Sequence, residues 1–150
     1  MSRQVSIPVV EGIIEYIFNN KELLWSALHA AGSREGGNDG NKTLAMLGDA
    51  VLKVVVLDDL IITGASRGNP GIISQRTNNI VSNQNLAGIC TTTGLAQYIN
   101  GNPSQWGEEQ TKTKTATIEA ILGAVFLDSG KKIDCVRTAM AALGLDARVG

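Results

Sequence analysis

The clearest helical signal in the chain lies in residues 113–129, which read TKTATIEAILGAVFLDS. The apolar side chains of this stretch recur at intervals of three and four residues and fall on one helical face: Ile118, Ile121, Leu122, Val125 and Phe126. Gly130 follows directly and provides a stop, because glycine readily adopts the left-handed conformation that ends a helix. The stretch therefore predicts an amphipathic helix that ends at Gly130.

The same periodicity covers most of the remaining chain. It predicts helices over about 10–18, 21–31, 42–62, 70–83, 83–92 and 133–143, with loops at 32–41, 64–71 and 99–112. The valine run in 42–62 is also compatible with a strand, but twenty residues without a breaker favour a helix. Pro70 suits the first turn of its helix. No strand is convincing, and the sequence predicts an all-α fold.

Length and composition indicate one globular domain over residues 1–150. The 13 Lys and Arg residues nearly balance the 14 Asp and Glu residues, so any nucleic-acid contact has to come from a local basic patch. No secretory signal is visible, and Lys53, Asp58 and Asp59 interrupt the longest apolar stretch. Two cysteines without zinc-site spacing fit a reducing compartment. We therefore expect no membrane span and a location inside the cell, in the cytoplasm, the nucleus or an organelle.

Two carboxylates stand out because each interrupts an otherwise apolar helix. Asp49 shares a helical face with Lys42, Ala45 and Lys53, and Glu119 follows Ala116 by one turn. An acid in such a place is often a metal or proton site. The alternatives are an ion pair from Asp49 to Lys53 and a first-turn helix acid at Glu119.

Two aromatic or ionisable side chains leave alternatives open. His29 is the only histidine, which excludes paired-histidine metal sites, and its place near an apolar face favours a structural role. Trp106 lies in a polar loop, where it can stack on a base or cap the loop.

Four segments resemble the ribonuclease III family. LAMLGDAVL at 44–52 is similar to the family signature LEFLGDAVL, and TIEAILGAVFLDSG at 117–130 resembles the second family motif. IVSN at 80–83 and GLAQYI at 94–99 resemble the family segments that lie between these motifs. Order and spacing agree from about residue 13 to residue 130.

The resemblance implies an all-α endonuclease domain that dimerises and accepts double-stranded RNA in a groove between subunits. In active members of the family a carboxylate cluster holds Mg²⁺ or Mn²⁺, and the metal activates water. Asp49 and Glu119 match two acids of that cluster. Ala45 and Ala116 stand where two more are expected, and Lys42 and Pro70 stand where accessory acids are expected.

These departures predict a ribonuclease III-type dimer that engages double-stranded or structured RNA, with cleavage weak or lost. Asp49 and Glu119 are the candidate catalytic and metal-binding residues. The candidate RNA-binding residues are Lys112, Lys114, Lys131 and Lys132, with Arg137 near them; a solvated surface is the alternative. The other two hypotheses are an active metal-dependent endoribonuclease and a structural or ribosome-associated subunit that forms a homodimer or heterodimer. No double-stranded-RNA-binding domain is expected after Gly150.

Overall fold

The computed structural model of the chain describes residues 2–33, 35, 37, 39–64, 69–101 and 107–145. These residues form seven α-helices and one 3₁₀ helix: α1 (Arg3–Ile14), α2 (Lys21–Ala27), α3 (Lys42–Thr63), α4 (Pro70–Val81), α5 (Asn83–Thr92), η1 (Leu95–Tyr98), α6 (Glu108–Asp128) and α7 (Ile133–Leu143). The same residues contain no strand beyond isolated bridges. The predicted all-α fold is confirmed.

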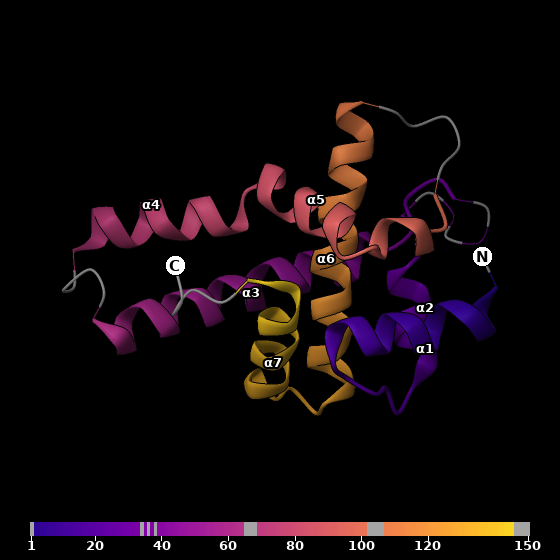
Figure 1. Cartoon of the computed structure of the whole chain (residues 1–150), viewed down its shortest axis with the longest axis horizontal. Helices are drawn as coiled ribbons and strands as arrows, with labels where there is room; N and C mark the ends of the chain where they lie inside the picture. Colours follow the sequence, from indigo (N-terminus) through magenta and orange to yellow (C-terminus); the bar gives the residue numbers. More distant parts are fainter. Residues whose placement is uncertain are drawn as a thin grey trace.

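The helices pack around a crossing of α3 and α6 (Figure 1). The helices α1 and α2 lie beside the lower part of α6, and α7 packs against both α1 and α3. The second half of α3 and the whole of α4 run antiparallel and extend away from the other helices as a two-helix arm. The arm returns through α5, which packs along α6. The crossing thus brings α3, α4, α5 and α6 to one region.

The helix α6 is the centre of the hydrophobic core. Ile118, Ile121, Leu122 and Val125 are fully buried, as the sequence predicts. The burial extends around the whole helix, because every residue from Thr117 to Val125 is buried except Glu119. The prediction of a one-sided amphipathic helix is therefore wrong for this segment. Glu119 marks the one place in it where α6 reaches solvent.

Two glycines allow α3 and α6 to touch through their backbones. A Cβ atom added to Gly48 would lie 1.6 Å from the carbonyl oxygen of Glu119, and one added to Gly123 would lie 2.3 Å from the carbonyl oxygen of Leu44. Each glycine is therefore the only residue that fits its position. This close approach sets Asp49 beside Glu119.

Several helix ends differ from the sequence prediction. The first helix ends at Ile14 and not at Phe18, because Glu15 takes a left-handed φ of 55°. The buried Glu11 carboxylate then accepts hydrogen bonds from the Phe18 N–H at 2.7 Å and from Lys21 Nζ at 2.6 Å. These bonds hold Phe18 in the core without helical structure.

The other differences concern short segments. The second helix ends at Ala27, the 3₁₀ helix η1 is not predicted, and α6 begins at Glu108 where the sequence indicates a loop. The helices at Asn83–Thr92 and Ile133–Leu143 match their predictions exactly in residue range. Trp106 lies outside the described residues.

The acid of the LDSG segment has a structural role. Asp128, at the end of α6, accepts hydrogen bonds from Tyr16 Oη, the Asn19 N–H and the Asn20 N–H, each at 2.8 Å. Partial burial raises the pKa of Asp128, but these hydrogen bonds and the charge of Lys21 outweigh it and leave the pKa lowered. Asp128 therefore connects the end of α6 to the turn between α1 and α2.

Among the described residues, no helix has the length and apolarity that a membrane span requires.

Candidate active site

The crossing of α3 and α6 brings the two candidate acids together. Asp49 and Glu119 share a side-chain hydrogen bond, and Lys53 Nζ lies 3.1 Å from Asp49 Oδ2. The ion pair between Asp49 and Lys53 is thus confirmed, and Asp49 also faces Glu119. The metal-binding role of Asp49 stays a prediction. Glu119 lies about three turns from the start of α6, so the first-turn interpretation of this acid is wrong.

The two acids lie in a pocket of about 690 Å³ formed by α3, α4, the start of α5 and α6. Its lining residues are Lys42, Ala45, Met46, Asp49, Lys53, Asn78, Val81, Ser82, Asn83 and Glu119. Three of the ionisable side chains lie on α3 and Glu119 lies on α6, whereas the α4–α5 wall carries amides and a hydroxyl. The sequence analysis did not identify Asn78 and Asn83 as site residues, although the run NNIVSN at 78–83 is rich in asparagine.

The environment of Glu119 favours its protonated form. Burial, the hydrogen bond to Asp49 and the negative charge of Asp49 raise the pKa of Glu119 to about 8, and Lys53 partly opposes them. Near neutral pH Glu119 is therefore mostly protonated.

We expect Glu119→Gln to remove a pH dependence of stability. The pKa of Glu119 is about 8 in the folded protein and 4.5 in the reference state, so the folded protein holds this proton more tightly. The stabilising contribution is complete below about pH 4.5 and is lost as the pH rises through about 8. Glutamine stays neutral at every pH, and its side-chain amide can still donate a hydrogen bond to Asp49. The variant should gain stability over the parent as the pH rises, as measured by urea unfolding at several pH values.

The matched control is Glu109→Gln, an exposed acid in the first turn of the same helix. Its stability difference from the parent should stay constant over the same pH range. A parent and a Glu119→Gln variant that lose stability in parallel would contradict the raised pKa of Glu119.

Known proteins resemble this chain over nearly its full length. A family model described as ribonuclease-III-like matches residues 20–140. The chain belongs to the ribonuclease III-like family. Ribonuclease 3 of Borreliella afzelii is 36% identical over 119 residues, which cover 75% of this chain and 48% of that protein. Ribonuclease 3 of Syntrophotalea carbinolica is 34% identical over 145 residues, which cover 92% and 61%. The chain thus spans about half to three-fifths of the length of these curated relatives.

The fold of this chain is similar to solved structures of a ribonuclease III nuclease domain. A nuclease domain of ribonuclease III from Campylobacter jejuni superposes with a TM-score of 0.78 and 27% identity, over 91% of this chain and 92% of that chain. A second structure of the same domain gives a TM-score of 0.79 and 28% identity, over 91% of this chain and 95% of that chain. That domain shows structural flexibility in a region involved in dimer formation. The family expected from the sequence motifs is confirmed.

The pocket of this ribonuclease III-like chain does not supply a carboxylate cluster. Among the described residues, no group of three or more His, Cys, Asp or Glu side chains is placed to hold a metal ion. Ala45 lines the pocket and is 8% exposed, whereas Ala116 lines an adjoining pocket together with Lys42 and Lys112. Pro70 begins α4 and does not line the pocket. Two carboxylates can contact one Mg²⁺ only if water and phosphate complete its shell.

The structure divides the predicted basic residues into two groups. Lys112 and Lys114 lie near the start of α6 and line one pocket, and Lys114 Nζ donates to Thr91 Oγ1 at 3.1 Å. Lys131 and Lys132 follow the opposite end of α6. A helix rises about 1.5 Å per residue, so about 24 Å of α6 separates Lys112 from Asp128. The five basic residues therefore do not form a single patch.

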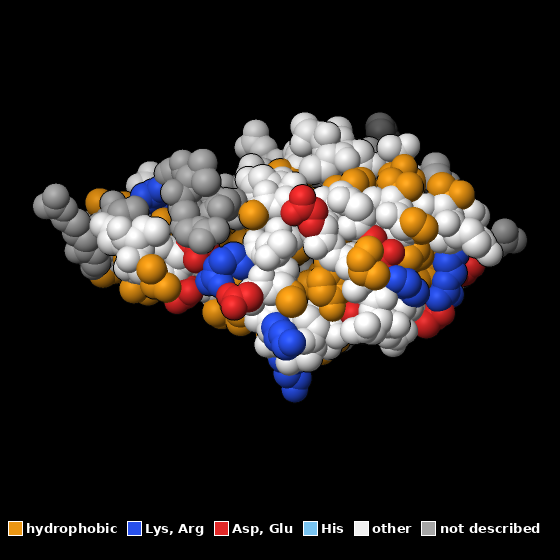
Figure 2. All heavy atoms as spheres, turned by 60° about the horizontal axis from the view of Figure 1, so that its bottom comes forward, with side chains coloured by type: hydrophobic (Ala, Val, Ile, Leu, Met, Phe, Trp, Pro, Cys, Tyr) orange, Lys and Arg blue, Asp and Glu red, His pale blue; other side chains and the backbone are white. Residues whose placement is uncertain are grey.

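Arg137 belongs to an ion-pair network. Its guanidinium contacts Asp58 at 2.8 Å, Asp59 at 3.0 Å and Asp134 at 2.7 Å. On the face shown in Figure 2, Lys and Arg side chains likewise lie next to acidic ones. This arrangement supports the solvated-surface alternative for that face.

His29 has the structural role that the sequence favours. It is 5% exposed, its Nδ1 lies 2.6 Å from the Trp25 carbonyl oxygen, and its Nε2 lies 3.2 Å from Glu35 Oε2. Both ring nitrogens therefore have protein partners, and the ring packs edge-on against Trp25.

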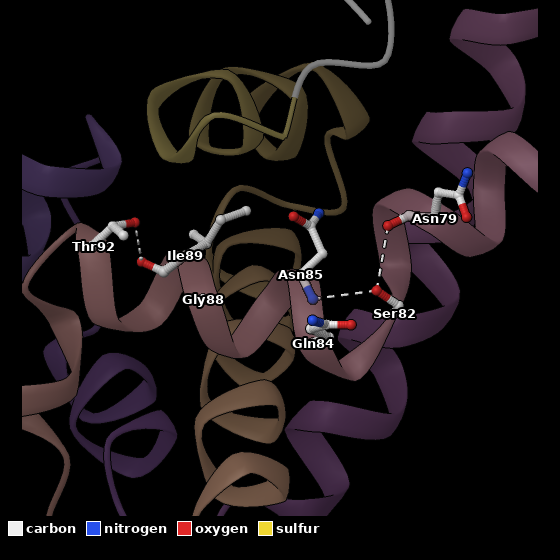
Figure 3. Close-up of a pocket in the computed structure, with 7 residues that line it drawn as sticks. All are labelled: Asn79, Ser82, Gln84, Asn85, Gly88, Ile89 and Thr92. Atoms are coloured by element: carbon white, nitrogen blue, oxygen red, sulfur yellow. Dashed lines mark hydrogen bonds between the residues drawn. The ribbon is translucent and has the colours of Figure 1, made fainter.

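An uncharged polar pocket adjoins the candidate site. It has a volume of about 560 Å³ and is lined by Asn79, Ser82, Gln84, Asn85, Gly88, Ile89 and Thr92 (Figure 3). Ser82 lines both pockets. Its hydroxyl donates to the Asn79 carbonyl oxygen at 3.3 Å and accepts from the Asn85 N–H at 3.2 Å, so it is committed to the α4–α5 turn (Figure 3).

Proposed function

We propose that this chain is a ribonuclease III-type domain that binds double-stranded or structured RNA and cleaves it weakly or not at all. The family is one of endonucleases that process double-stranded RNA. The observation that carries the proposal is the composition of the pocket: Asp49 and Glu119 face each other, while Ala45 and Ala116 occupy the other two carboxylate positions. The shape of the family domain is retained, but half of its metal-binding side chains are replaced.

RNA contact is consistent with the basic residues around this pocket. Lys112 lines an adjoining pocket with Lys42, and a further pocket with Lys114. Proteins recognise duplex RNA mostly through its shape, phosphates and 2′-hydroxyls, so a degraded catalytic site does not abolish recognition. We place the RNA contact on this side of the molecule and leave Lys131 and Lys132 outside it.

We also propose that the chain forms a dimer, with itself or with a related chain. The α3–α4 arm exposes apolar side chains that water solvates poorly: Val54 (52% exposed), Ile61 (65%) and Ile62 (73%) on α3, and Ile72 (45%) on α4. Figure 2 shows hydrophobic side chains on this end of the molecule. The Campylobacter jejuni nuclease domain has a region involved in dimer formation. We place the dimer inside the cell, where the thiols of Cys90 and Cys135, which form no disulfide, stay reduced.

Asp49 and Glu119 are the side chains that would contact Mg²⁺ or Mn²⁺. A metal bound there would supply charge stabilisation and an activated water. With two carboxylates, of which Glu119 is mostly protonated near neutral pH, the pocket favours weak metal binding at most.

The test is an incubation of the protein with long duplex RNA and Mg²⁺ or Mn²⁺, beside the variants Asp49→Asn and Glu119→Gln. We expect the parent to bind the RNA and to cut it slowly or not at all. Binding should weaken as salt increases, because phosphate contacts release counterions. Gel electrophoresis measures cutting, and fluorescence anisotropy measures binding.

The other hypotheses give different results in the same assay. Cutting by the parent that disappears in both variants would establish an active metal-dependent endoribonuclease. An absence of RNA affinity at low salt, with the protein folded, would favour a structural subunit.

A further inference from the structure

Two lysines flank Asp49 on the α3 wall of the candidate pocket. Lys42 begins α3, and Lys53 lies about three turns further along, with Asp49 between them. Lys53 pairs with Asp49, whereas Lys42 is exposed and forms no ion pair with any described residue. The ammonium group of Lys42 is therefore available to an anion that enters the pocket.

The formal charge of the pocket differs from that of a carboxylate cluster. Four ionisable side chains line it, and Lys42 and Lys53 balance Asp49 and Glu119 when all are charged. A phosphate that approaches a cluster of four carboxylates needs metal ions between the like charges. No such excess of negative charge exists here, so a phosphate can approach the lysines directly.

The α4–α5 wall adds neutral hydrogen-bond donors. Asn78 and Asn83 line the pocket from this side, and both are exposed. Side-chain amides commonly contact phosphate oxygens in protein–nucleic-acid complexes. Ser82 contributes less, because its hydroxyl is engaged in the α4–α5 turn (Figure 3). The pocket thus has cationic donors on one wall and amide donors on the other.

We propose that Lys42 binds a phosphate of the RNA backbone directly in this pocket, without a bridging metal ion, and that Lys53, about three turns further along α3, adds positive charge for a neighbouring phosphate. The inference rests on the proposed RNA-binding function and names the ligand group and the residues that hold it. Lysine is suited to this role, because its ammonium is a compact charge with three donors. The adjoining pocket, lined by Lys42, Lys112 and Glu109, continues the contact along the RNA backbone.

The test is a titration of a short duplex RNA with the parent chain in EDTA and in Mg²⁺, between about 50 and 200 mM salt. The variants are Lys42→Ala, Lys42→Arg and the double variant Lys42→Ala/Lys53→Ala, with Lys132→Ala as the control at the far end of α6. We expect equal affinity of the parent in EDTA and Mg²⁺. Lys42→Ala should weaken binding about fivefold to tenfold and reduce the salt slope by about one. The double variant should lose more affinity for RNA than Lys42→Ala does. Lys42→Arg and Lys132→Ala should bind RNA with the affinity of the parent.

The outcomes separate this inference from the proposed function. Failure of the parent to bind RNA at low salt overturns both. RNA binding that requires Mg²⁺, or that Lys42→Ala and Lys132→Ala change equally, overturns only the direct phosphate contact. Both lysines are exposed, so circular dichroism should report a parent-like fold for every variant.

Discussion

Replacement of Gly48 by alanine is expected to destabilise the domain severely. The new methyl carbon would lie 1.6 Å from the carbonyl oxygen of Glu119 and 3.0 Å from the backbone nitrogen of Gly123. These are backbone atoms of a buried helix, so no side-chain rotation relieves the clash and α3 has to move away from α6. We expect a loss of at least about 4 kcal/mol in the free energy of unfolding. Because small domains are stable by only about 5–15 kcal/mol, this loss removes at least about a quarter of the free energy of unfolding, and urea titration should show a large fall in the unfolding midpoint.

The matched control is Gly12→Ala in α1. Gly12 also lies inside a helix, but a Cβ there meets nothing within 4 Å. Alanine should therefore stabilise the protein by up to about 1 kcal/mol through its helix propensity. A Gly48→Ala protein that unfolds at the same urea concentration as Gly12→Ala would contradict the described approach of α3 to α6.

The helices could be predicted where the sequence carries local signals. The structure agrees with the predicted ranges at Asn83–Thr92 and Ile133–Leu143, where Ser82 caps the first helix and Gly144 ends the second. Local signals did not predict helix ends that are determined by contacts with residues further along the chain. The first helix ends early, since the buried Glu11 carboxylate binds the backbone of Phe18 and the ammonium of Lys21. The hydrophobic periodicity of a sequence does not show that a buried acid will accept hydrogen bonds from a loop further along the chain.

The candidate site was predictable in its residues but not in its arrangement. Asp49 and Glu119 stand out in the sequence as lone acids in apolar helices, and the family motifs assign them to one site. Their mutual hydrogen bond depends on Gly48 and Gly123, which let two backbones touch. The division of the lysines between the two ends of α6, and the amide wall from α4 and α5, required the packing of the helices.

Restoration of the missing carboxylates is expected to create metal-dependent RNA cleavage. The double variant Ala45→Glu/Ala116→Asp returns four acids to the region around Asp49 and Glu119. Ala45 lines the pocket directly, and Ala116 lines the pocket next to it, so both new side chains have space beside them. Bound metal contributes several kcal/mol to such reactions. We expect cutting of long duplex RNA in Mg²⁺ to rise at least about a hundredfold over the parent, which equals about 2.7 kcal/mol of barrier.

The control variant is Ala45→Gln/Ala116→Asn, which adds the same volume without the charges. Since hard cations prefer carboxylate oxygens, this variant should bind Mg²⁺ and cut RNA no better than the parent. Addition of Glu119→Gln to the restored variant should remove the gain, because the site then loses one of its four acids. A restored variant that is folded, binds RNA and holds Mg²⁺, yet cuts no faster than the Gln/Asn control, would show that the replaced acids are not what limits cleavage in this chain.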